Sequence, residues 1–293
     1  MRNRLNASMV AIAIASVVAA IAIMTKGATG QTPAATSRST IQFPTAYKAP
    51  RMPDGNPDLN GIWQQFTTAA WDIQDHPAAP GPYPEMMGVY GAQPAGVGIV
   101  EGNEIPYQPW ALAKKKENFE KRLTADPFHL DIGDPVAKCY MAGVPRATYE
   151  PFPFRIVQST GNIMIVYEYA NVARIIHFGK MPPPPVDSWM GQSVGRFEGE
   201  TLVVTATGFN DRTWFDRAGN FHSEALTITE RYTPVSPYHL MYEATIDDPK
   251  VFTRPWKISF PLYRRMERNA DVLEFSCVEL VEPFLYGSLR RRD

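Results

Sequence analysis

The sequence predicts a mainly β protein, built either as an antiparallel β-barrel of the lipocalin-like meander type or as a sandwich. From residue 154 onward, apolar and polar residues alternate with a period of two in short segments, as in half-buried strands. Turn-forming residues separate these segments at intervals of about 8–12 residues. Only one helical pattern is present, so no helices are available to cover a parallel sheet. A barrel is favoured over a sandwich because closure leaves no exposed edge strand.

The first 30 residues have the pattern of a secretory signal. Arg2 and Arg4 precede an almost wholly apolar run over residues 7–24, and small residues follow at 27–30. We therefore predict that the signal peptide at 1–30 is cleaved and that the protein is periplasmic or secreted. The alternative is an uncleaved anchor. Residues 31–40 are small and polar, which predicts a disordered linker.

Charge and hydropathy limit the partners of the 293-residue chain. Its formal net charge is −1, and removal of residues 1–30 makes it more negative because that segment carries basic residues and no acidic ones. A mildly acidic exported protein has no electrostatic reason to bind nucleic acid or an anionic membrane. No later segment approaches the roughly 20 apolar residues of a membrane span, so we expect no stable membrane insertion after cleavage.

Residues 41–125 are predicted to form an extended arm. Proline recurs throughout 41–109, which excludes a continuous helix or a central strand. The many aromatic residues among these prolines indicate that the arm docks on a folded body by its rings. A short strand is expected over 61–66. A helix is expected over 109–123, where Pro109 suits the first helical position.

Residues 126–293 are predicted to form the barrel domain. Strands are expected at 163–169, 172–178, 201–207, 223–232, 240–247, 252–260 and 272–280. Because alternate residues of a strand face opposite sides, Leu226 and Ile228 mark the inward face of the segment 222–230. The same argument turns several polar residues inward in their strands, namely Arg174, His222, Glu224, Glu230 and Arg254. Either the two arginines and the two glutamates neutralise one another in a buried network, or the inward polar residues form the polar floor of an apolar cavity.

The segment 208–224 is the densest in polar and aromatic side chains. Asp211 or Asp216 could orient His222 as a general acid–base pair near neutral pH, with Glu224 as a second acid or base. The alternative is an ordinary hairpin loop stabilised by its Asn and Asp residues, in which Trp214 plugs the end of the barrel.

Several short motifs are only weak signals of a catalytic or metal-binding site. The G-x-S-x-G match at 191–195 lacks the strand-to-helix context of a nucleophile elbow. His222-x-Glu224 lacks the P-C-x-x-C half of the zinc deaminase signature. A metal site that combines His222 and Glu224 with His177 or His239 has no supporting ligand spacing. With no nucleotide-binding motif either, we predict no metal and no organic cofactor.

Cys139 and Cys277 are the two cysteines of the chain. In an oxidising compartment they favour a single disulfide over two buried thiols.

Several motifs along the chain resemble one pattern. They lie at 57–63 (PDLNGIW), 139–146 (CYMAGVPR), 188–196 (SWMGQSVGR), 208–214 (GFNDRTW), 222–226 (HSEAL) and 247–250 (DDPK). Together they resemble a large family of exported bacterial proteins. The resemblance covers nearly the whole chain after residue 30. It implies export and agrees with pairing of Cys139 and Cys277, but it implies no particular chemistry.

Three hypotheses of function follow. In the first, the barrel is a cofactor-independent lyase, isomerase or hydrolase that acts on an apolar or aromatic small molecule. His222, Glu224, Asp211 and Asp216 would be catalytic, and the residues binding substrate would be Arg174, Trp189, Trp214, Glu230 and Arg254. In the second, the protein is a non-catalytic carrier of the same class of ligand. In the third, it is a structural or interaction module of the cell envelope.

Overall fold

The computed structural model describes residues 47–81, 84, 91–123, 132–275 and 277, all within the unit Phe43–Asp293. The predicted signal peptide and the linker at 31–40 lie outside the described residues. Within them, no helix is long and apolar enough to cross a membrane.

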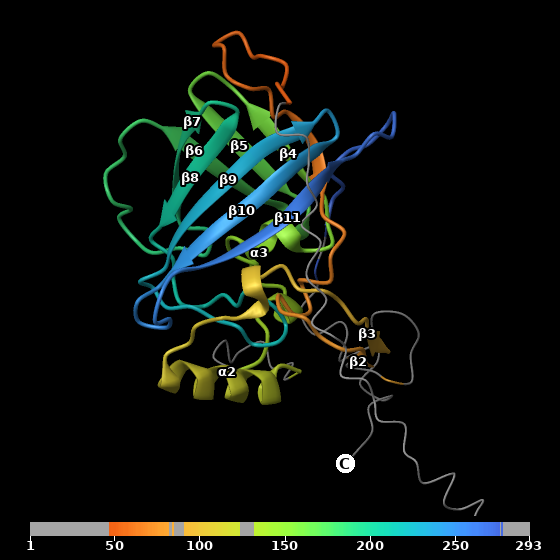
Figure 1. Cartoon of the computed structure of the whole chain (residues 1–293), viewed down its shortest axis with the longest axis vertical. Helices are drawn as coiled ribbons and strands as arrows, with labels where there is room; N and C mark the ends of the chain where they lie inside the picture. Colours follow the sequence, from red (N-terminus) through yellow and green to blue (C-terminus); the bar gives the residue numbers. More distant parts are fainter. Residues whose placement is uncertain (1–46, 82–83, 85–90, 124–131, 276, 278–293) are drawn as a thin grey trace, which may run out of the picture. The chain divides into compact units, whose positions relative to one another are not determined.

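Nine strands form a closed barrel, which confirms the predicted mainly β fold (Figure 1). The strands are β1 (Gly61–Gln64), β4 (Phe154–Gln158), β5 (Asn162–Tyr167), β6 (Val172–Phe178), β7 (Gln192–Glu198), β8 (Thr201–Thr207), β9 (Thr227–Ser236), β10 (His239–Asp247) and β11 (Trp256–Arg264). Around the barrel they run in the order β1-β11-β10-β9-β8-β7-β6-β5-β4. A separate small sheet pairs β2 (Ala79–Pro80) with β3 (Ala92–Gln93).

The barrel departs from a wholly antiparallel meander at one pair. β6 and β7 are parallel, with Ile176 opposite Ser193, whereas every other adjacent pair is antiparallel. The proline-rich connection 179–191 returns the chain to the end of the barrel where β6 began, so that β7 starts in the same direction.

The predicted arm supplies a strand of the barrel. β1 lies between β4 and β11, and Trp63 is opposite both Phe154 and Arg264. The closed sheet therefore includes residues that precede the predicted domain boundary at 126. Other parts of the described arm bond to the barrel, as where the Ser259 N–H donates to the Ile99 carbonyl at 2.9 Å, and the helix α2 (Pro109–Lys121) confirms the predicted helix.

Two strands begin later than predicted. β9 starts at Thr227 because residues 222–226 form a turn, in which the Ser223 backbone N–H and hydroxyl both donate to Asp248. β11 starts only at Trp256. The backbone N–H groups of Val251 and Phe252 donate to the Asp248 carbonyl in a turn, and so they do not bond to a neighbouring strand. The strand predicted at 272–280 is not formed over 272–275, and most of its remainder lies outside the described residues.

Shorter helices fill the connections. They are η2 (Glu101–Asn103), η3 (Val136–Lys138), α3 (Arg146–Tyr149) and η4 (Tyr169–Asn171). All four residues of α3 are buried, and the Tyr149 ring meets the inward Phe260 ring edge-on, so α3 lies against one end of the barrel (Figure 1). Cys139 and Cys277 form a disulfide with their Cα atoms 5.4 Å apart, which confirms the predicted pairing.

Candidate functional site

The interior of the barrel holds a buried ion pair between Arg174 and Glu230. The Arg174 guanidinium is bidentate on Glu230, with Nη1 to Oε1 at 3.1 Å and Nη2 on Oε2, and its Nε donates to Ser193. The hydroxyls of Tyr232 and Tyr242 also donate to Glu230 Oε1. The predicted inward orientation of Arg174 and Glu230 is confirmed. Burial alone would lower the pKa of Arg174, but Glu230 outweighs it and raises that pKa.

His222 is buried at the end of the barrel, with 2% of its surface exposed. Its Nδ1 lies 2.9 Å from the Ser223 carbonyl and therefore carries the proton, which leaves Nε2 to accept from the Thr213 hydroxyl. The rings of Phe209 and Phe215 surround the imidazole. Burial lowers the pKa of His222 below its usual value, so the imidazole is neutral at pH 7. Neither ring nitrogen bonds to a described carboxylate, and the predicted acid–base pair is not formed.

The two aspartates predicted as partners of His222 are placed differently. Asp211 is exposed. Asp216 is fully buried, and it accepts hydrogen bonds from the Ile73 backbone at 2.9 Å and from the backbone and side chain of Asn220. It thus ties the arm to the loop before β9. Burial, and then the nearby Asp72, raises the pKa of Asp216 to about 7.

The predicted inward orientation of Glu224 and Arg254 is wrong. The Glu224 side chain is 48% exposed and pairs with Lys250. The Arg254 side chain is 59% exposed and lies 3.8 Å from Glu104. Both residues precede the strands to which they were assigned, so the alternation of faces does not reach them.

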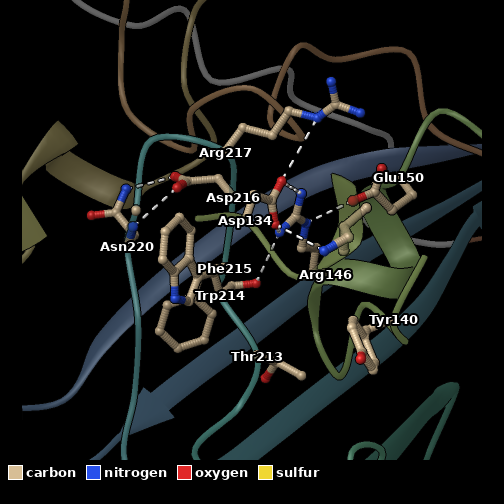
Figure 2. A network of polar contacts seen from close by, with 12 residues as sticks. Asp134, Tyr140, Arg146, Glu150, Thr213, Trp214, Phe215, Asp216, Arg217 and Asn220 are labelled. Atoms are coloured by element: carbon tan, nitrogen blue, oxygen red, sulfur yellow. Dashed lines mark hydrogen bonds and ion pairs between the residues drawn. The ribbon is translucent and has the colours of Figure 1, made fainter. Parts of the chain in front are cut away.

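Trp189 and Trp214 lie in different surroundings. Trp189 is half-buried and stacks on Tyr140, with the ring centroids 5.4 Å apart and the planes at 8°. Trp214 is buried at the end of the barrel, where its carbonyl lies 3.5 Å from Arg146 (Figure 2). Its burial matches the alternative in which Trp214 plugs the barrel end.

A second buried network was not predicted. Arg146 lies between Asp134, at 2.8 and 2.9 Å, and Glu150, at 2.6 Å, and all three side chains are almost fully buried (Figure 2). Arg217 reaches Asp134 at 3.9 Å. The motif at 139–146 ends on Arg146, which is the sequence signal that could have indicated it. Because its charges are matched and sealed from solvent, we assign this network a structural role.

A cavity of about 260 Å³ opens where β1, β9, β10 and β11 meet. We call it the rim pocket. Its aromatic walls are Tyr47, Trp63 and Tyr238; its other apolar residues are Ala49, Pro50, Pro234, Pro237, Leu240 and Met266; its polar residues are Asp58, Ser236 and Arg264. Sequence reasoning selected none of these as site residues, although Asp58 and Trp63 lie in the motif at 57–63.

Arg264 contacts Pro237, Asn60 and Trp63 in the rim pocket. Its Nε donates to the Pro237 carbonyl at 3.0 Å, its Nη1 donates to the Asn60 carbonyl at 2.6 Å, and the guanidinium lies 4.3 Å above the Trp63 ring. Gly61 makes this approach possible, because a Cβ there would lie 2.3 Å from Nη1. Burial lowers the pKa of Arg264, while Asp58 opposes that effect.

Comparison with known proteins adds no assignment. No protein-family model matches the chain, and no curated protein matches it. The resemblance of its motifs to exported bacterial proteins stays a prediction. Among the described residues, no group of three or more His, Cys, Asp or Glu side chains is arranged to hold a metal ion.

Proposed function

We propose that the protein is an exported binding protein for a small apolar or aromatic molecule, held in the rim pocket. The observation that carries this proposal is the composition of that pocket: aromatic and aliphatic walls around a few fixed polar groups. Such a lining is typical of sites that bury small apolar ligands and orient them by a small number of polar contacts.

The geometry of the wall supports the same ligand class. Tyr238 is 51% exposed at the mouth of the pocket, whereas Leu240 and Trp63 are buried beneath it. A flat apolar molecule that enters there removes the exposed Tyr238 face from water together with its own surface, and both changes favour binding.

Binding is better supported than acid–base catalysis at the 208–224 loop. His222 is sealed from solvent, and both ring nitrogens are engaged by Thr213 and the Ser223 carbonyl. A general base has to reach the proton that it removes, either directly or through one water. Glu224 points to solvent and pairs with Lys250, away from His222.

A neutral fluorescent probe tests the proposal. N-phenyl-1-naphthylamine should bind the purified protein with a rise in its fluorescence, and Tyr238→Ala should weaken that binding about tenfold by removing contact area. The matched control is Phe66→Ala, because Phe66 is similarly exposed, at 68%, but lies outside the pocket. Absence of binding, or equal loss in both variants, would contradict the proposal.

A further inference from the structure

The rim pocket contains a cation, Arg264, that is not in ion-pair contact with Asp58, the carboxylate in the same pocket. Arg264 forms no ion pair with any described carboxylate, and its Nη2 has no hydrogen-bond partner among the described residues. By contrast, the buried Arg146 and Arg174 are each matched by carboxylates within 3.1 Å. Burial lowers the pKa of Arg264, and the attraction of Asp58 offsets that effect only in part.

The free edge of this guanidinium is fixed in advance. The Pro237 and Asn60 carbonyls hold Nε and Nη1, and the Trp63 ring supports one face of the group. A ligand that bonds to Nη2 therefore does not have to order a long flexible side chain, which is a large part of the usual cost of binding to arginine.

We infer that the ligand of the rim pocket is an aromatic monocarboxylate whose carboxylate pairs with Arg264. This inference rests on the proposed function and adds the charge of the ligand to it. A monoanion fits better than a phosphate, because the pocket offers one guanidinium and also holds the carboxylate of Asp58. A doubly charged group would be left without enough positive charge.

A pair of probes of the same shape tests the inference. Calorimetry on the purified protein should show that 2-naphthoate binds about tenfold more tightly than the neutral 2-naphthamide. Arg264→Gln should bring the ratio of the two affinities to about one. The control is Arg265→Gln, which removes the same charge from the adjacent residue, whose guanidinium bonds to Gln64 and Glu267 instead. That variant should keep the tenfold ratio.

A second variant, Asp58→Asn, tests the carboxylate inference if Arg264→Gln does not fold. Asp58 Oδ1 accepts from the backbone and side chain of Asn60, and an asparagine oxygen can accept both bonds. Asp58→Asn therefore removes a negative charge near Arg264 and keeps the loop. It should raise the naphthoate-to-naphthamide affinity ratio about threefold, and raised salt should lower that ratio in the unmodified protein.

The outcomes separate the two proposals. If neither naphthalene probe nor N-phenyl-1-naphthylamine binds, the proposed function and the inference both fail. If the neutral probes bind and naphthoate binds no better than naphthamide, the pocket takes apolar ligands and only the carboxylate inference is overturned. A ratio near ten that survives in Arg264→Gln overturns the assignment to Arg264.

Discussion

The barrel interior and the rim pocket each hold an arginine among aromatic rings, but only the interior arginine forms an ion pair with a carboxylate. Arg174 is fully enclosed and bidentate on Glu230, whereas Arg264 is half-buried and bonds to two backbone carbonyls. A charge sealed inside a barrel has to be neutralised by the chain itself. A charge at the rim can be compensated by water or by a ligand. The difference indicates which arginine is structural and which is available for binding.

The largest effect is expected inside the barrel. Arg174→Met leaves Glu230 buried without its cation and should lower the free energy of unfolding by about 3–5 kcal/mol. Urea unfolding measures the loss. A loss equal to that of Arg264→Met would remove the distinction between the two arginines.

Asp216 extends the comparison to a buried carboxyl group that forms no ion pair with a described residue. Its pKa of about 7 in the folded protein exceeds that of an aspartate in an unfolded chain, so the folded state binds the proton more tightly. The stability contributed by Asp216 is therefore present at low pH and is lost as the pH rises to about 7. The loss should be on the order of 2–4 kcal/mol.

Asp72→Asn sharpens this prediction, because it removes the like charge beside Asp216. The pKa of Asp216 should fall, and the loss of stability with rising pH should become smaller. Carboxyl NMR titration follows the pKa, and urea unfolding at several pH values follows the stability. The exposed Asp211→Asn should change neither quantity, and an effect as large as that of Asp72→Asn would contradict the assignment.

A smaller effect is expected at the rim. Arg264→Met removes two hydrogen bonds to carbonyls and the contact with Trp63, but it leaves no buried charge unpaired. The free energy of unfolding should fall by about 1–2 kcal/mol in urea. A much larger loss would mean that Arg264 serves the fold in the same way as Arg174.

The smallest effect is expected at Glu224, whose ion pair with Lys250 is exposed. Glu224→Gln should leave the thermal midpoint unchanged within error and should leave binding to the rim pocket unchanged. A clear loss of either would show that Glu224 has a role that its exposed position does not indicate.

The sequence predicts the fold well where strands are regular. The alternation of residues placed the bounds of β5, β6, β8 and β10 within about two residues. It also turned Arg174 and Glu230 inward, because both residues lie inside their strands. Glu224 and Arg254 were misplaced because turn hydrogen bonds to Asp248 delay β9 and β11, and the periodic pattern carries no sign of those bonds. The direction of β7 depends on the path of the proline-rich connection, which has no periodicity.

The rim pocket could not be predicted in the same way. It brings the segment 47–63 together with 234–240 and Arg264, and no local pattern reports that these segments meet. The nearest signal is the motif at 57–63, in which Gly61 precedes Trp63. A glycine beside a buried aromatic indicates a close approach of another group, but only the structure identifies that group as Arg264.

The position of β1 has a consequence for the order of folding. β1 is the first described strand to be synthesised, yet one of its two partners, β11, is the last. Until β1 has docked between β4 and β11, the ring stays open, and both of these strands expose unpaired backbone groups. Such long-range closure is slow, and during that interval another copy can insert its own first strand into the gap. Swapped dimers joined through β1 are therefore the misfolded form to expect at high concentration.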